Sequence, residues 1–168
     1  MTHLKTALVP RLPKSATPLS LKARAISALA RRDYSRKELH QKLLGFAESE
    51  LVLSDLLNEL ETKKLLSNAR FADALVNQRQ GKFGLARLVY ELEQHGLDPE
   101  IIQSQKQQLA QTEHTRALAV WTKRFGVRPS TGSEKAKQMR FLASRGFSPE
   151  VFCWLEANDF SPVESSSS

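Results

Sequence analysis

The chain carries apolar residues at three- and four-residue intervals along most of its length, and no stretch alternates apolar and polar residues over a convincing distance. The first pattern is typical of the buried face of an α-helix, whereas alternation would indicate a strand. The positions expected on buried helical faces are Leu21, Ala25, Ala28, Leu29, Leu39, Leu43, Phe46, Leu53, Leu56, Leu57, Leu60, Phe71, Leu75, Val76, Leu85, Leu88, Val89, Leu92, Ile101, Ile102, Leu109, Leu118, Trp121, Phe125, Met139, Phe141, Leu142, Val151, Phe152, Trp154 and Leu155. We therefore expect an all-α fold without strands.

A glycine followed by an apolar residue ends three of these helical stretches, at 45–46, 96–97 and 146–147, which are 51 and 50 residues apart. Glycine just past a helix end can adopt the left-handed cap conformation. After two of the three pairs the chain restarts with Asp-Pro-Glu at 98–100 and Ser-Pro-Glu at 148–150. Asp or Ser suits the N-cap of a new helix and Pro suits its first position. The pattern predicts a repeat of helix, elbow and helix.

A unit of about 50 residues buries too little apolar surface to be very stable alone, and repeat proteins solve this by stacking neighbouring units. We expect three tandem three-helix modules of about 50 residues each, which form an elongated, curved array. The expected division is a disordered basic segment at 1–19, modules at 20–65, 66–111 and 112–160, and a disordered Ser-rich tail at 161–168. Residues 100–125 have no strong stop signal, so the pattern leaves open whether they form one helix or two.

The 168 residues carry a net charge of +7, and the charge is sorted by segment rather than mixed. Residues 20–45 hold seven Lys or Arg and two acids, residues 46–62 hold five acids and no base, and residues 123–145 hold seven bases and one acid. Such sorting indicates either basic faces that meet a polyanionic partner or faces that are merely solvated.

Enzyme chemistry finds little support in the sequence. The four histidines show no metal-ligand pairing at helical spacing, and Cys153 is the only cysteine. We expect Cys153 to be buried and inert because its neighbours are apolar. We expect no catalytic residue, metal site or cofactor, and no membrane span or signal peptide, hence a cytoplasmic protein.

Three phrases of the chain resemble the signatures of the RecX family: RRDYSRKEL at 31–39, RFADALVNQRQGKFG at 70–84 and RFLASRGF at 140–147. The likeness runs from about residue 20 to about residue 158, with the phrases in order and at matching intervals. It departs from the family at Ser67-Asn68-Ala69, where acidic residues are common, and at Leu85, where proline is frequent.

The resemblance implies tandem three-helix modules that bind the RecA recombinase and its filaments on DNA. It also implies a negative regulator, which limits filament growth, ATPase and strand exchange in DNA repair, recombination and the SOS response. A stand-alone helical DNA- or RNA-binding module without a RecA partner is the alternative, and a helical scaffold for another protein a third. We expect a monomer, and direct contact with single- or double-stranded DNA stays open.

Basic residues supply the candidate contacts, either to an acidic surface of RecA or to DNA phosphates. The candidates are Arg31, Arg32, Arg36, Lys37, Lys42, Arg79, Lys82, Arg87, Lys123, Arg124, Arg128, Lys135, Lys137, Arg140 and Arg145. Each could instead belong to a solvated helix. The loop from Gly81 to Gly84 could let backbone amides approach an anion, but a plain turn between helices is the favoured interpretation.

Aromatic residues divide into two groups. Those on apolar stripes are expected in cores rather than on a base-stacking surface; they are Phe46, Phe71, Trp121, Phe141, Phe147 and Trp154. Tyr34 and Phe83 fall in expected loops and are the better candidates for use at the surface.

Overall fold

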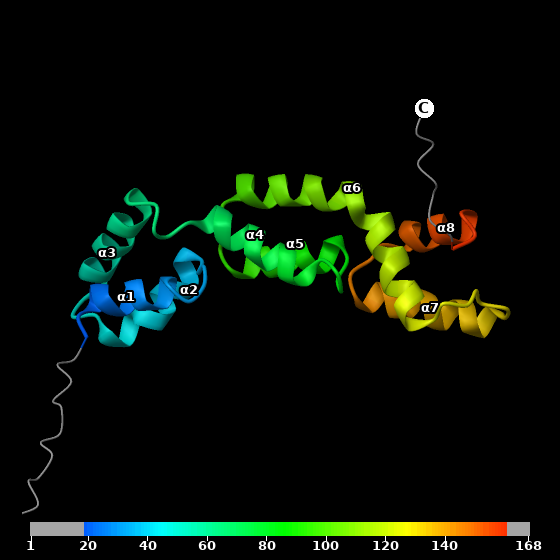
Figure 1. The fold of residues 1–168 in the computed structure, drawn as a ribbon, viewed down its shortest axis with the longest axis horizontal. Coiled ribbons are helices and arrows are strands. Elements are labelled where there is room, and N and C mark those ends of the chain that lie inside the picture. Colours follow the sequence, from blue (N-terminus) through cyan, green and yellow to red (C-terminus); the bar gives the residue numbers. More distant parts are fainter. Residues whose placement is uncertain (1–18, 161–168) are drawn as a thin grey trace, which may run out of the picture.

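The computed structural model describes residues 19–160, and this range contains α-helices, one short 3-10 helix and no strand (Figure 1). The all-α prediction is therefore confirmed. The elements are α1 (Leu21–Leu29), α2 (Arg36–Leu43), the 3-10 helix η1 (Leu44–Phe46), α3 (Glu50–Thr62), α4 (Asn68–Arg79), α5 (Leu85–Gln94), α6 (Pro99–Arg124), α7 (Gly132–Ser144) and α8 (Pro149–Ala157). The terminal segments expected to be disordered, 1–19 and 161–168, lie outside the described residues except for Leu19.

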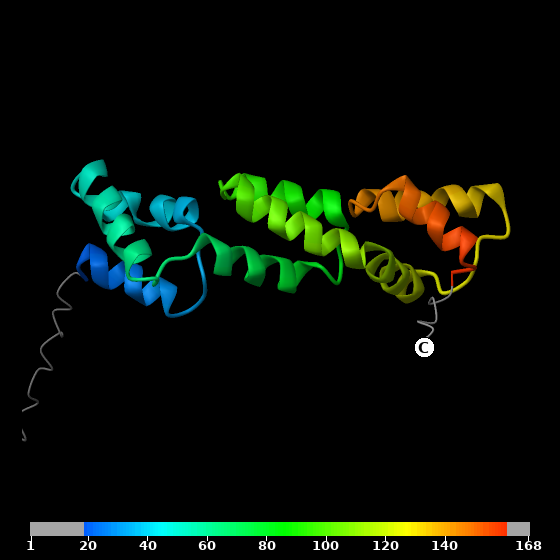
Figure 2. The same cartoon turned by 90° about the horizontal axis from the view of Figure 1, so that it is seen from above.

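The helices form an elongated row of three groups, which two perpendicular views show clearly (Figures 1 and 2). Module 1 consists of α1, α2, η1 and α3. Module 2 consists of α4, α5 and the first half of α6, and module 3 of the second half of α6, α7 and α8. Each module has its own hydrophobic core, centred for example on Leu39, Leu92 and Phe152. The predicted tandem array of three-helix modules is present.

Helix α6 answers the question that the sequence leaves open, because it runs without a break from Pro99 to Arg124. Pro99 occupies a first-turn position and no glycine or proline interrupts the following residues, so nothing forces the helix to stop. Its first half contributes Leu109 to the core of module 2, and its second half contributes Ala117 and Trp121 to the core of module 3. The two modules are thus joined by one continuous helix.

The three glycine elbows are not equivalent. Gly96 and Gly146 have φ angles of +64° and +84°, as expected for left-handed caps, and the next residues, Leu97 and Phe147, are buried. Gly45 instead lies within η1 without a positive φ, and this tight turn directs Phe46 outward, where 56% of the residue is exposed. The prediction that Phe46 belongs to the core is wrong.

Two further side-chain predictions are wrong. Tyr34, expected at the surface, is only 9% exposed and belongs to the core of module 1. Cys153, expected to be buried, is exposed on α8. Helical periodicity explains Cys153, since the residues that face the core are Val151, Phe152 and Leu155, and position 153 points away from that stripe.

Two lysines surround one carboxylate of module 1. The Nζ atoms of Lys22 and Lys63 lie 2.6 and 2.5 Å from Oε1 of Glu59. Hydrogen bonds from these two ammonium groups lower the pKa of Glu59 to about 2. Because the folded pKa lies below the unfolded one, the pairing stabilises the fold above the ordinary glutamate pKa and fades as pH falls towards 2.

We expect the Glu59 carboxyl carbon to keep its ionised NMR chemical shift at about pH 3.5, where an ordinary glutamate is mostly protonated. The Lys63→Met variant removes one ammonium group and should move the titration of Glu59 towards ordinary values. A Glu59 that titrates like an unpaired glutamate in the unmodified protein would contradict the pairing.

Candidate interaction surface

Modules 2 and 3 meet through direct backbone contact between two glycines. The amide of Gly84 donates to the carbonyl of Arg145 at 2.9 Å, and the amide of Ala86 donates to the carbonyl of Gly146 at 3.1 Å. A Cβ atom on Gly84 would overlap the backbone of Gly146 and Phe147, so the contact requires glycine at this point. The carbonyls at the end of α7 thus satisfy amides at the start of α5, which would otherwise lack partners.

Two polar side chains of α6 complete this joint. The carboxylate of Glu113 accepts from the amide of Leu85 at 3.0 Å. The guanidinium of Arg116 donates to the carbonyls of Phe83 at 2.7 Å and Leu109 at 2.9 Å. Burial lowers the pKa of Arg116, and the charge of Glu113 opposes that shift.

The loop from Gly81 to Gly84 is therefore a turn whose last amide is already bonded within the protein. This outcome matches the favoured interpretation from the sequence. The alternative, a loop whose amides receive an anion, does not hold at Gly84 because Arg145 occupies that amide.

An open groove of about 470 Å³ lies beside this joint, between modules 2 and 3. Its apolar lining includes the rings of Phe83 and Phe141, and no acidic residue lines it. Four cations surround it and none of them is bonded to a carboxylate within the described part of the chain: Lys82, Lys123, Arg124 and Arg145. We call this the inter-module groove.

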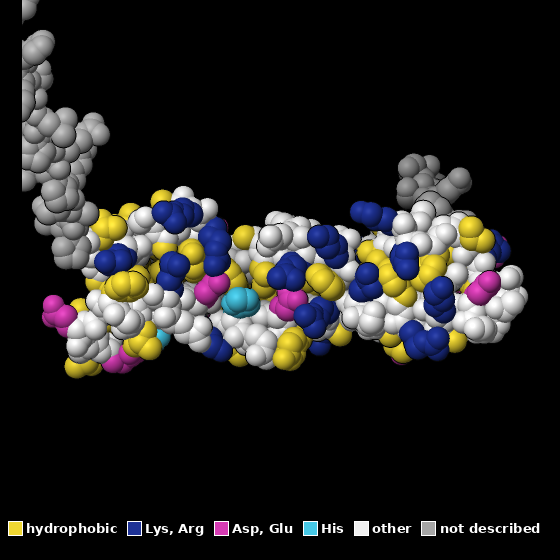
Figure 3. Space-filling view, turned by 90° about the horizontal axis from the view of Figure 1, so that it is seen from below, with side chains coloured by type: hydrophobic (Ala, Val, Ile, Leu, Met, Phe, Trp, Pro, Cys, Tyr) yellow, Lys and Arg dark blue, Asp and Glu magenta, His cyan; other side chains and the backbone are white. Residues whose placement is uncertain are grey.

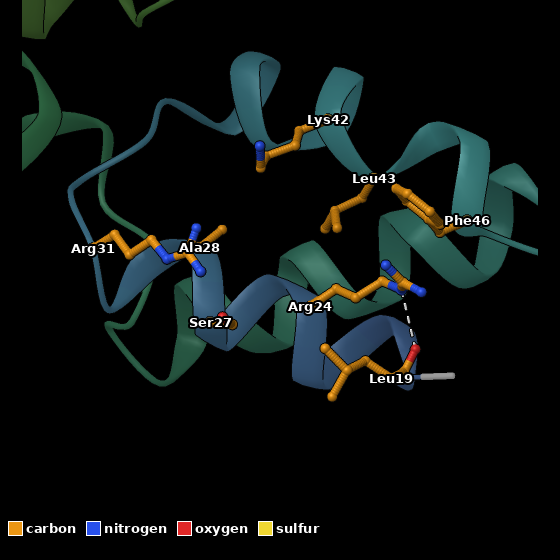
Figure 4. A pocket seen from close by; sticks show the side chains of 8 residues that line it. All are labelled: Leu19, Arg24, Ser27, Ala28, Arg31, Lys42, Leu43 and Phe46. Carbon is orange, nitrogen blue, oxygen red and sulfur yellow. Dashed lines mark hydrogen bonds between the residues drawn. The ribbon is translucent and has the colours of Figure 1, made fainter. Parts of the chain in front are cut away.

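A smaller pocket of about 270 Å³ lies in module 1 between α1 and the end of α2 (Figure 4). Arg31, Lys42 and Arg24 point towards it from different sides, and Leu43 lies between them. No acidic residue lines this module 1 pocket either. Its edge is formed by Phe46, and the guanidinium carbon of Arg24 lies 4.1 Å from the centre of that ring.

The predicted basic residues fall into two classes in the structure. Those whose side chains bond to other groups of the chain are Arg32, Arg36, Lys37, Arg79, Arg87, Arg128 and Lys135. Those with no such bond in the described range are Arg31, Lys42, Lys82, Lys123, Arg124, Lys137, Arg140 and Arg145. The second class is available to a partner, and six of its members line the groove or the pocket.

The bonded class has structural tasks. Arg32 holds both carboxylate oxygens of Glu38, at 2.7 and 2.9 Å, and this guanidinium is the main reason that the pKa of Glu38 is lowered. Arg36 bonds Glu61 at 2.5 Å and so ties α2 to α3. Lys37 reaches the carbonyl of Gln94, across the boundary between modules 1 and 2, at 2.9 Å.

Sequence reasoning missed Arg24 as a functional candidate. The side chain is placed by its hydrogen bond to the carbonyl of Leu19 and by the ring of Phe46, which lies 22 positions away in the chain. No local pattern connects these two positions. The groove is different, since Phe141 on α7 and Arg145 at its C-cap stand four residues apart, a spacing that places them on one side of the helix.

Lys and Arg side chains recur along one side of the molecule. Figure 3 shows Lys and Arg side chains over all three modules on the face seen from below, with fewer Asp and Glu side chains scattered among them. Within residues 19–160 no helix is both long and apolar enough to cross a membrane, and no group of His, Cys, Asp and Glu could hold a metal ion. The module 1 pocket and the inter-module groove offer positive charge and apolar surface.

Comparison with known proteins gives consistent matches over most of the chain. Residues 67–104 match the family model for the second three-helix domain of RecX, and residues 111–152 match that for the third. The regulatory protein RecX of Ralstonia pickettii is 48% identical over 140 residues, 83% of this chain and 88% of the relative. That of Herminiimonas arsenicoxydans is 46% identical over 130 residues, 77% of this chain and 86% of the relative.

A solved structure agrees with the fold. The crystal structure of RecX from Lactobacillus salivarius has a TM-score of 0.71 at 18% identity, with 82% of this chain and 93% of that chain covered. At this identity the likeness concerns the arrangement of helices.

Proposed function

The chain belongs to the RecX family of regulatory proteins, and from this premise we propose that it restrains the RecA recombinase by binding RecA and its filaments on DNA. The observation that carries the proposal is the set of unpaired cations in the module 1 pocket and the inter-module groove of an elongated row of modules (Figure 1). A filament of nucleoprotein is polyanionic and repeats along its length. A rod with cations in successive modules complements both properties.

An extended molecule gains from contacting more than one protomer. Once one module is bound, the next contact becomes intramolecular and benefits from a high effective concentration. A free RecA monomer offers a single contact and should bind more weakly. Occupation of neighbouring protomers would limit filament growth, nucleotide hydrolysis and strand exchange.

The first test is the ATPase rate of RecA on single-stranded DNA with this protein present at substoichiometric amounts. We expect clear inhibition, because one elongated molecule engages several protomers. An ATPase rate that does not change would refute the proposal. If the protein bound nucleic acid tightly under the same conditions, the stand-alone nucleic-acid-binding alternative would take its place.

A pair of charge reversals on one helix sharpens this test. Lys123→Glu places a carboxylate in the inter-module groove, whereas Lys106→Glu makes the same change on α6 beside a different pocket, which Glu93 and Glu113 line. We expect Lys123→Glu to weaken inhibition roughly tenfold, a change of about 1.4 kcal/mol, and Lys106→Glu to have little effect. Equal effects of the two variants in a titration of RecA ATPase would argue against contact through the groove.

A further inference from the structure

We propose that Arg24 on Phe46 in the module 1 pocket and Arg145 on Phe141 in the inter-module groove form two platforms, each of which stacks one unpaired base of a single-stranded nucleic acid. The proposal goes beyond RecA regulation, since it requires no RecA. Each platform is an arginine guanidinium that lies over a phenylalanine ring at the edge of a pocket without acidic residues.

The module 1 platform is held in place before any ligand arrives. The Nε atom of Arg24 donates to the carbonyl of Leu19 at 3.1 Å, and its guanidinium carbon lies 4.1 Å from the centre of the Phe46 ring (Figure 4). The ring itself is largely exposed, which is unusual for a phenylalanine that has a nearby core to join. Bases stack on aromatic faces and on arginine planes alike, so a fixed arginine on an exposed ring suits a flat ligand.

The second platform has a similar construction at the joint between modules 2 and 3. The guanidinium carbon of Arg145 lies 3.7 Å from the centre of the Phe141 ring. Phe141 is in turn held by an edge contact with Phe125, whose ring centre lies 5.0 Å away. Arg145 has no carboxylate partner in the described part of the chain, so no neighbouring acid neutralises its charge.

Cations beside each platform could pair with the phosphates on either side of a stacked base. Arg31 and Lys42 line the module 1 pocket, and Lys82 and Lys123 line the groove. A nucleotide unit combines one flat base with a negative charge on either side, and this combination matches both sites. An acidic peptide supplies negative charge through its carboxylates, but these carry no flat aromatic ring that could stack on the platform.

A third arginine lies over an aromatic ring and shows what the two platforms have in common. Arg32 lies 3.6 Å from the centre of the Tyr34 ring, but its guanidinium is bonded to both oxygens of Glu38, and Tyr34 is buried. That pair is structural. The two platforms differ from it by the lack of a carboxylate partner and by the cations around them, and the ring of the first platform, Phe46, is exposed.

The test uses the full-length chain without RecA and an oligothymidylate that carries one 2-aminopurine, whose fluorescence falls when the base stacks. We expect quenching with the single strand and much weaker binding to the same sequence as a duplex. Arg24→Lys and Arg145→Lys keep the positive charge and remove the planar guanidinium. Each variant should bind the oligonucleotide about tenfold more weakly, the loss expected for one stacked base, and the quenching should be lost. Phe46→Leu removes the aromatic ring of the same platform and should weaken binding as much as Arg24→Lys does.

Arg128→Lys is the matched control, because its guanidinium bonds Asp159 outside both pockets, and it should bind like the unmodified chain. Four results would overturn the proposal. Two of them are no difference in affinity between Arg24→Lys or Arg145→Lys and the control, and equal affinity for duplex and single strand. The other two are equal affinity for AMP and the oligonucleotide, and full displacement of the oligonucleotide by an equimolar oligoglutamate that contains one tryptophan. Inhibition of RecA without any quenching would overturn only this inference, whereas quenching without inhibition would overturn only the regulation of RecA.

Discussion

Gly84→Ala should destabilise modules 2 and 3 by about 3 kcal/mol, near the upper end of the usual cost of overpacking. The φ angle of Gly84 is −80°, which alanine adopts freely, so the cost comes from contact alone. Its Cβ would overlap the backbone of Gly146, and backbone cannot rotate away as a long side chain can. Relief requires α5 and the end of α7 to separate, which breaks the hydrogen bonds from Gly84 and Ala86.

Urea unfolding followed by circular dichroism measures this loss, and Gly81→Ala is the matched control. Gly81 lies in the same turn, and a Cβ there meets nothing within 4 Å. Gly146→Ala should be at least as harmful as Gly84→Ala, because its Cβ would lie 2.5 Å from the amide nitrogen of Arg87 and its φ is +84°. If Gly84→Ala and Gly81→Ala unfolded at the same urea concentration, the close backbone contact would be wrong.

Arg116→Met should also destabilise the protein by about 3 kcal/mol, since hydrogen bonds from a charged group are lost and their acceptors are left behind. Methionine preserves most of the side-chain volume, so the experiment removes the polar contacts rather than the packing. The carbonyl of Phe83 would lose its short bond, and Glu113 would lose the nearby positive charge. Hydrogen exchange should show the α4–α5 turn and the start of α5 opening more often.

Lys106→Met provides the comparison for this variant. Lys106 lies on the same helix and is exposed, and the same change there should alter the free energy of unfolding by less than about 0.5 kcal/mol. Exchange rates at Leu85 and Ala86 that matched in the two variants would show that Arg116 does not hold the joint. A large loss at Lys106 would point instead to a general weakness of α6.

Periodicity was enough to predict the helices, because each module buries a stripe at three- and four-residue spacing. Leu53, Leu56, Leu57 and Leu60 are all buried on α3, as their spacing indicates. The same rule misplaced Phe46, because η1 changes the direction of the chain just after α2. Helical spacing therefore predicts which side chains are buried only as far as the same helix continues.

The joint between modules 2 and 3 could not be read from the sequence. Gly84 and Gly146 are far apart in the chain, and glycine signals a turn at each position without naming a partner. The single helix α6 was equally undetermined, since a run of Gln, Ala and Thr neither breaks a helix nor guarantees one.

Charge clusters located the candidate surface but could not divide it into free and bonded residues. Arg87 and Glu91 are four apart, so that pair was visible in the sequence. The partners of Arg36 and Lys37 come from α3 and from the end of α5, which only the fold brings near. Arg24 joined the candidates for the same reason, through a ring from another helix.

The way in which the joints differ bears on how the protein is made. Every buried residue of the module 1 core lies between Ala25 and Leu66, so this unit can close while the ribosome is still translating the remainder. The start of α5 has no such independence, because Arg145 and Gly146, whose carbonyls accept from its first amides, are synthesised about 60 residues after it. The nascent chain should therefore fold in two steps, first module 1 and then, once α7 and the residues after it have been synthesised, modules 2 and 3 together.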